Sequence, residues 1–158
     1  MTSYDVMQLF AEQLERNVQS TQDCKVKVVI TPSSIREKGV VIKVSLLKTT
    51  PDKVYQAKTE SRSVRLRVSV QGTIESQEGL RQAVEMVEAL DRYLQDEKLR
   101  LEKIIEGENS MQAVRKIPNT RITCKLSEED SFIDNPDSTD VQDIQDDRTV
   151  TITIPEEI

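Results

Sequence analysis

The sequence predicts an α+β fold: a two-layer sandwich in which a mainly antiparallel five-stranded sheet carries two helices on one face. Five short segments alternate apolar and polar residues with period two, which is typical of strands that are buried on one side. Two longer segments repeat apolar residues with the period of an amphipathic helix. The length of 158 residues corresponds to a single domain, 1–158. The apolar stripes of the helices are expected to cover the apolar face of the sheet.

The first predicted element is a helix that begins near the N-terminus. Thr2 is suited to cap it, and Asp5 occupies the position of the reciprocal partner in a capping box. The opposite, polar face of this helix carries Glu12, Gln13 and Arg16. Apolar residues with helical spacing form its buried face: Met7, Phe10, Ala11, Leu14 and Val18.

The five predicted strands cover residues 24–32, 39–47, 64–71, 120–126 and 148–154. In each strand, valine, isoleucine or leucine occupies alternate positions, so one face of the sheet is aliphatic. The core is expected to be aliphatic too, because aromatic residues make up only 3% of the chain. The other face is expected to be basic, with the following residues pointing outward: Lys25, Lys27, Lys43, Arg65, Arg67, Arg121, Lys125 and Arg148.

A long helix is predicted between the third and fourth strands. Ser76 is a suitable N-cap, Glu78 complements the positive end of the helix dipole, and Gly107 is suited to end the helix. Such a helix would be about 45 Å long, which is more than the sheet needs for cover. We therefore expect its charged second half to project or to meet a neighbouring chain. Its apolar stripe consists of Leu80, Ala83, Val87, Leu90 and Leu94, and Leu101 and Ile104 continue the register.

A polar segment at 48–63 joins the second and third strands. Val54 and Tyr55 are isolated apolar residues within it, and such residues are natural anchors on a polar arm. Two interpretations remain open: a plain flexible loop, or an arm that docks onto an adjacent subunit through these two side chains.

The segment at 127–147 joins the last two strands and holds nine acidic residues and no lysine or arginine. Without it the net charge of −6 becomes +3, so the acidity belongs to this loop. It is longer than structural loops usually are and is therefore either functional or disordered. Because it lacks the glycine of an EF-hand loop, we expect no metal site here. The candidate interaction residues of this acidic loop are Glu128, Glu129, Asp130, Asp146 and Asp147.

The composition gives catalysis little support. The chain has no histidine, the commonest general base, and no Gly-rich phosphate loop or nucleophile-elbow motif. Cys24 and Cys124 are expected to be reduced and to pack as small apolar residues. We therefore expect a protein that is not an enzyme and has no cofactor. With no apolar run of membrane-spanning length and no secretory signal, a cytoplasmic location without membrane contact is expected.

The basic sheet face has three interpretations. It is a solvated surface, a protein interface that an acidic partner or another copy of the chain complements, or a surface for nucleic acid. Sheets that bind single strands interleave stacking aromatic residues with basic ones. None of the outward positions is Phe, Tyr or Trp, so nucleic acid is not favoured.

The order of these elements resembles that of the tail terminator proteins of long-tailed bacteriophages and of the related cap proteins of contractile injection systems. The likeness covers residues 3–126 and the last strand: a capped helix, a three-stranded meander, a long helix and a final strand pair. It is most evident in VVIKVSLLKTTPDKVYQ at 40–56, an aliphatic strand followed by a polar arm. It is equally evident in VRLRVSVQGTIESQEGLRQAVEMVEALDRYL at 64–94, a strand followed by an amphipathic helix.

The resemblance implies a structural protein that forms a ring of six copies and closes the end of a tail tube in a virion or phage-like particle. The sheet would build the ring, and the arm and the long helix would contact neighbouring copies. Tail-tube or neck proteins would be its further partners. The residues leave a second possibility open: a small monomeric adaptor that binds a charged protein or nucleic acid through the basic sheet face.

Overall fold

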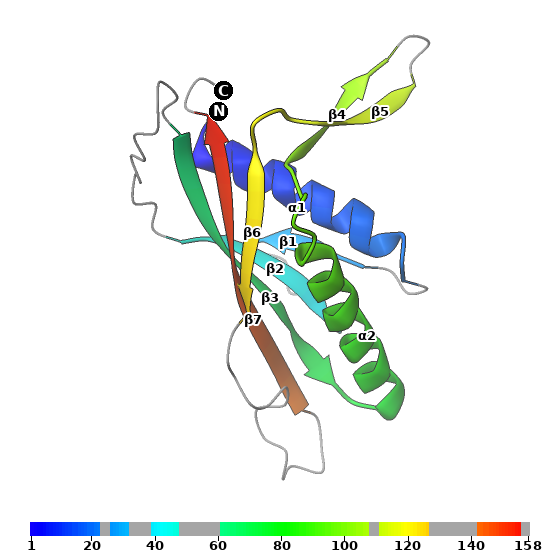
Figure 1. The fold of residues 1–158 in the computed structure, drawn as a ribbon. Helices are drawn as coiled ribbons and strands as arrows, with labels where there is room; N and C mark the ends of the chain where they lie inside the picture. The colour runs from blue at the N-terminus through cyan, green and yellow to red at the C-terminus, as the bar shows by residue number, and fades with distance from the viewer. Residues whose placement is uncertain (23–25, 32–38, 48–60, 108–110, 127–141, 156–158) are drawn as a thin grey trace.

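The computed structural model of the chain describes residues 1–22, 26–31, 39–47, 61–107, 111–126 and 142–155. Within them it confirms the α+β class, with a five-stranded sheet, two helices and a two-stranded hairpin that the sequence did not predict (Figure 1). The helices are α1 (Ser3–Gln19) and α2 (Gln77–Leu94). The strands are β1 (Val28–Ile30), β2 (Val41–Leu46), β3 (Ser61–Ile74), β4 (Glu102–Glu106), β5 (Gln112–Lys116), β6 (Arg121–Leu126) and β7 (Gln142–Pro155).

The main sheet has the strand order β1-β2-β3-β7-β6. The pairings of β2 with β3, β3 with β7 and β7 with β6 are antiparallel, whereas β1 runs parallel to β2. The expected three-stranded meander is therefore wrong at its first strand. Alternation of residues determines which face of a strand is buried, but not the direction in which the strand runs. The last strand of the chain lies between β3 and β6, and β6 forms an edge (Figure 1).

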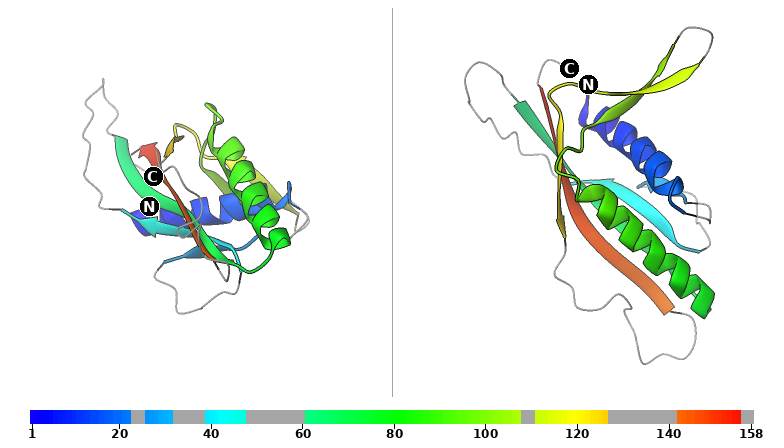
Figure 2. Two further views of the ribbon diagram at one scale, coloured as in Figure 1. Left: turned by 90° about the horizontal axis from the view of Figure 1, so that it is seen from below. Right: turned by 45° about the vertical axis from the view of Figure 1, so that its right-hand side comes forward.

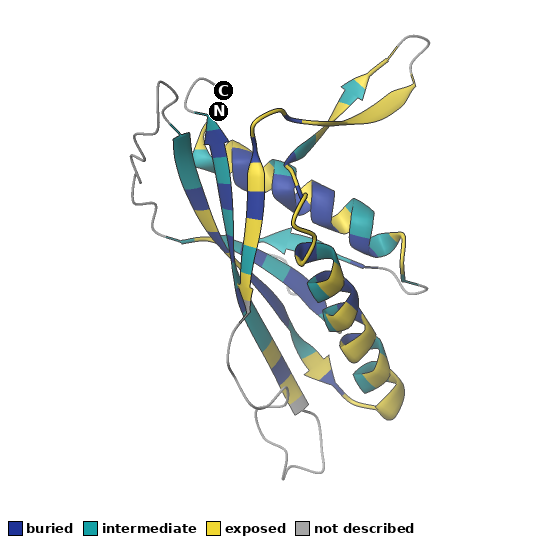
Figure 3. Ribbon diagram, viewed as in Figure 1, coloured by how far each residue is buried: buried dark blue, intermediate teal, exposed yellow. Residues whose placement is uncertain are grey.

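Both helices cover the same face of the sheet, as the views in Figures 1 and 2 show. Phe10 and Leu14 of α1 and Leu90 of α2 are fully buried in the core. Figure 3 shows the buried inner stripe and the exposed outer surface of each helix. The inward residues of β2, β3 and β7 that are fully buried beneath the helices are Ile42, Val44, Val64, Leu66, Val68, Val70, Val150, Ile152 and Ile154.

Both helices begin where the sequence predicted. The backbone N–H of Asp5 donates to Thr2 Oγ1 at 3.1 Å, and the N–H of Thr2 donates to the Asp5 carboxylate at 2.8 Å. These bonds form the expected capping box, and the hydrogen bond from Thr2 N lowers the pKa of Asp5. Ser76 caps α2, because its hydroxyl accepts a hydrogen bond from the N–H of Gly79 at 3.1 Å.

The predicted end of the long helix is wrong, because α2 ends at Leu94 and not near Gly107. The Asp96 carboxylate accepts from Lys98 N at 2.9 Å, and the Asp96 carbonyl accepts from Leu99 N at 3.2 Å, which closes a turn. This turn brings Leu99 and Leu101 back into the core, where both are buried. A helix that continued past the sheet would leave these leucines in water. The chain then forms the hairpin of β4 and β5.

Gln13 of α1, which we expected on the polar outer face, is fully buried. Its Nε2 donates to Tyr93 Oη at 2.7 Å and to the Arg100 carbonyl at 2.8 Å. Its Oε1 accepts from the N–H of Glu102 at 2.8 Å. The segment that leaves α2 therefore covers this flank of α1, and Arg16 adds an ion pair with Glu102 at 3.3 Å. Gln13 joins α1 to both α2 and the base of the hairpin.

Tyr93 provides a test of this packing. Burial raises the pKa of its phenol to about 12. In an alkaline titration followed by phenolate absorbance, we expect one late step near this pH, and Tyr93→Phe should remove it. Because tyrosine in the unfolded chain ionises near pH 10.0, stability should also fall as the pH rises from 10.0 through about 12. Circular dichroism at each pH is the control, and a late step that accompanies the loss of helical signal would contradict the assignment.

Candidate protein interface

The face of the main sheet that the helices leave uncovered is the first candidate site. Residues of β3, β7 and β6 lie opposite one another on it in three successive rows. Every position in these rows is a cation or carries a hydroxyl group, and none is acidic. The rows are Ser63–Thr153–Arg121, Arg65–Thr151–Thr123 and Arg67–Thr149–Lys125.

The cations of this surface are accessible. Arg65, Arg67, Arg121 and Lys125 are exposed, and Lys43 of β2 is half-buried in the next row; we call these five residues the cationic face. Within the described part of the chain, none of them forms an ion pair. Adjacent strands lie about 4.8 Å apart, so the cations of β3 and β6 stand about 10 Å apart across β7. The threonines of β7 lie between them, and this array of donors fits the carboxylate or phosphate groups of a partner.

The charge of the uncovered face changes sign along the sheet. In the row of Lys43, next to the three rows above, the hydroxyl of Ser69 donates to the carboxylate of Asp147. Further along, Asp143 accepts a hydrogen bond from Thr73 Oγ1 at 3.1 Å. Asp147, which we expected in a loop, lies in the sheet because β7 begins at Gln142. One end of the face is therefore positive and the other end is negative.

Arg148 and Asp146 differ from the prediction because both lie on the helix side of β7. Arg148 shares alternate positions with Val150 and Ile152, and its side chain is only 1% exposed. Its Nε lies 2.8 Å from Asp91 Oδ1 of α2, an ion pair without the geometry of a hydrogen bond. Its Nη2 donates to Asp146, and burial raises the pKa of Asp91 despite the nearby guanidinium. This ion-pair cluster joins α2 to the sheet and is not part of the cationic face.

The remaining predicted residues are distributed as follows. Lys27 precedes β1 and is half-buried. Residues 61–63 of the expected arm begin β3, and residues 142–147 of the acidic segment begin β7. Burial raises the pKa of the Cys124 thiol, which is half-buried among apolar residues. The residues outside the described part of the chain are Cys24, Lys25, Val54, Tyr55, Glu128, Glu129 and Asp130.

The hairpin of β4 and β5 is a second candidate surface, and sequence reasoning missed it. It extends away from the sheet and the helices (Figures 1 and 2). Its exposed apolar residues are Ile104, Val114 and Met111, with exposed fractions of 43%, 53% and 71%. A hairpin signal was present, since two five-residue runs flank a short segment that begins with Gly107.

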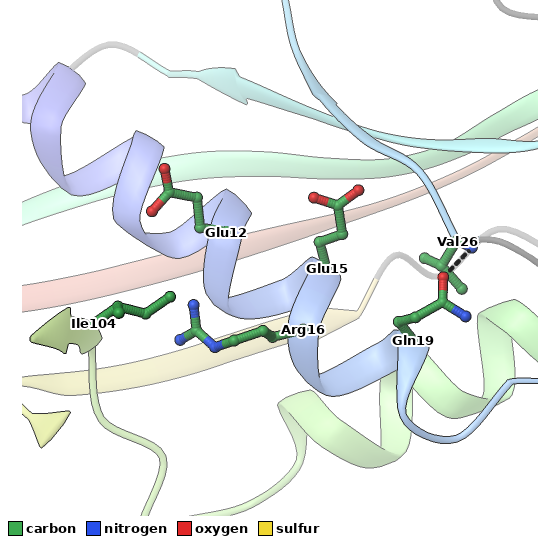
Figure 4. Close-up of a pocket in the computed structure, with 6 residues that line it drawn as sticks. All are labelled: Glu12, Glu15, Arg16, Gln19, Val26 and Ile104. Atoms are coloured by element: carbon green, nitrogen blue, oxygen red, sulfur yellow. Dashed lines mark hydrogen bonds between the residues drawn. The ribbon is translucent and has the colours of Figure 1, made fainter. Parts of the chain in front are cut away.

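An open groove separates this hairpin from α1. It has a volume of about 490 Å³, and Ile104 forms its wall on the hairpin side. Figure 4 shows Glu12 and Glu15 projecting from successive turns of α1 and Arg16 extending toward Ile104. Both glutamates are exposed, whereas Arg16 is half-buried and pairs with Glu102, so the exposed charges on the helix side of the groove are acidic. Gln19 and Val26 complete its lining.

Within the residues that the structure describes, no three His, Cys, Asp or Glu side chains gather in a way that could hold a metal ion. Neither α1 nor α2 has the length and the apolar character needed to cross a membrane. A scan against models of known protein families finds no match for the chain, and a search among curated proteins finds no matching sequence. The charge and geometry of the two surfaces are therefore the basis for a functional proposal.

Proposed function

We propose that this protein is a structural subunit that assembles into a ring and caps or completes a phage or phage-like tail tube, as the tail terminator proteins that it resembles do. The observation that carries the proposal is the uncovered cationic face. A chain with a net charge of −6 presents three rows of residues with four cations and no acid. Such a concentration of one charge sign favours contact with an acidic surface of another molecule.

A ring suits this charge distribution. Cyclic assemblies of identical chains use two different patches that complement each other. The cationic face is one such patch, and the chain has more acidic than basic residues overall, 28 against 22, from which to form the other. Because the chain contains no histidine, we propose a role in assembly and no catalytic role.

Light scattering at low and high salt tests this proposal. We expect the wild-type protein to have the mass of several chains at low salt and a smaller mass at high salt, because salt screens exposed charges. Arg65→Glu/Arg67→Glu should shift the protein to single chains, whereas the matched control Arg65→Lys/Arg67→Lys, which keeps both charges, should assemble. A strict monomer at every concentration and salt would exclude the ring.

The cationic rows also favour a second candidate, a small adaptor that binds a charged protein or nucleic acid. Cations and hydroxyl groups fit the phosphate backbone of a nucleic acid. The nine positions of the rows include no aromatic residue on which a base could stack. Binding of a labelled DNA duplex whose affinity falls steeply with salt, by a protein that stays monomeric, would favour the adaptor.

A further inference from the structure

The hairpin of β4 and β5 contacts α1 only near its base within the described residues, where Glu102 bonds to Gln13 and Arg16. All five residues of β5 are exposed, and the two strands form a sheet of their own. A ribbon of two strands is only marginally stable in water unless it packs against another element. The inner face of the hairpin, which includes Ile104, lines the groove beside α1. The outer face therefore remains for contact with another molecule.

The outer face carries an unfavourable pair of charges. Lys103 lies directly opposite Arg115, and Ile105 lies opposite Ala113. Along each strand these residues alternate with the residues of the groove-lining face, so their side chains point away from the groove. Like charges directly opposite each other destabilise a strand pair. An acidic partner would relieve this repulsion.

The outward side of α1 presents a complementary pattern. Glu12 and Glu15 are exposed, and within the described part of the chain neither forms an ion pair. Glu12 and Glu15 are separated by about 4.5 Å along the helix axis. Side chains of a directly opposed strand pair, such as Lys103 and Arg115, stand about 5 Å apart.

We propose that the hairpin of one copy of this protein docks in the groove of the next copy, with its outer face against α1. Lys103 and Arg115 pair with Glu12 and Glu15 of that copy, so the hairpin strands cross α1 at a steep angle. The contact joins two different patches, as a ring requires, so this inference rests on the proposed function and names one of its interfaces.

A charge-swap experiment tests the contact by light scattering at low salt. Variant one is Glu12→Lys/Glu15→Lys, and variant two is Lys103→Glu/Arg115→Glu. In each variant the hairpin and α1 carry charges of the same sign and repel each other, so each variant alone is expected to have the mass of a single chain. Mixing them restores both pairings, because hairpin and helix have opposite signs at every contact between unlike chains. The mixture is therefore expected to regain the wild-type mass. Lys103→Arg/Arg115→Lys, which preserves the charges, is the control and should assemble alone.

The possible results separate this inference from the proposed function. If the wild type assembles and both reversed variants assemble equally well, the hairpin contact is wrong while the ring proposal stands. If each variant is monomeric and circular dichroism shows it to be folded, but the mixture does not assemble, the two patches do not face each other. A wild type that is monomeric at every concentration overturns both proposals.

Discussion

Replacing Gln13 by leucine is expected to lower the free energy of unfolding by about 3 kcal/mol, because each buried polar group left without a partner costs about 1–3 kcal/mol. Leucine fills a similar space but forms no hydrogen bonds. The Arg100 carbonyl and the N–H of Glu102 would each lose a bond of 2.8 Å to the Gln13 side chain. The Tyr93 hydroxyl would lose its donor at 2.7 Å. Urea denaturation with linear extrapolation measures the change.

Gln8→Leu is the matched control for this substitution. Gln8 lies on the same helix, but it is exposed, and a surface substitution usually changes stability by less than about 0.5 kcal/mol. Because Gln13 bonds to both Arg100 and Glu102, its loss should also speed amide hydrogen exchange in β4 more than in β3. Equal destabilisation by the two leucines would contradict a special role for Gln13.

The alternation of apolar and polar residues predicted the five strands of the main sheet and, except at Arg148, the side to which the described side chains of β2, β3, β6 and β7 point. Val64, Leu66, Val68 and Val70 are buried as expected, and Arg65 is exposed between them. This success has a simple physical cause, since successive side chains of a strand point to opposite faces. The cationic face was therefore predictable, because it follows from alternation within individual strands.

Features that depend on contacts between distant segments were not predictable from local patterns. The burial of Gln13 requires the segment after α2 to cross α1, and nothing in the spacing of α1 indicates this crossing. Leu101 and Ile104 fit the helical register of the preceding residues, yet the turn at Asp96 buries the first and leaves the second in the hairpin. The groove was missed for the same reason, whereas the hairpin was missed because its first run was assigned to the long helix.

Arg148 is a different case, because the alternation of residues in β7 already indicated that its side chain points to the helix side of the sheet. It shares the alternate positions of Val150, Ile152 and Ile154, and all four are buried. An arginine in a row of aliphatic residues predicts a buried ion pair, since an unpaired buried charge is costly. Its partner Asp91, in α2, could not be identified from the spacing within the strand.

Replacing Gly72 by alanine is expected to lower the free energy of unfolding by about 3 kcal/mol, at the upper end of the usual cost of overpacking. A Cβ atom on Gly72 would lie 2.4 Å from the carbonyl oxygen of Gly39 and 2.7 Å from the Cα of Val40. Both are backbone atoms, so relief requires the segment that leads into β2 to move. Gly39 has a φ of +89°, in the region that favours glycine, so the close approach to Gly72 involves a glycine on each strand. Urea denaturation of the two proteins measures the loss.

Gly79→Ala adds the same methyl group at a site where the structure has room for it. There the new Cβ would lie 3.4 Å from Ser76 Oγ and 3.8 Å from Ile74 Cγ2, which are ordinary contacts. Gly79 lies in the first turn of α2, and alanine is a better helix former than glycine, so stability is expected to rise by up to about 0.5 kcal/mol. The two substitutions should thus have opposite signs. A loss at Gly79 as large as that at Gly72 would mean that the close approach of Gly39 is not the reason for glycine in β3.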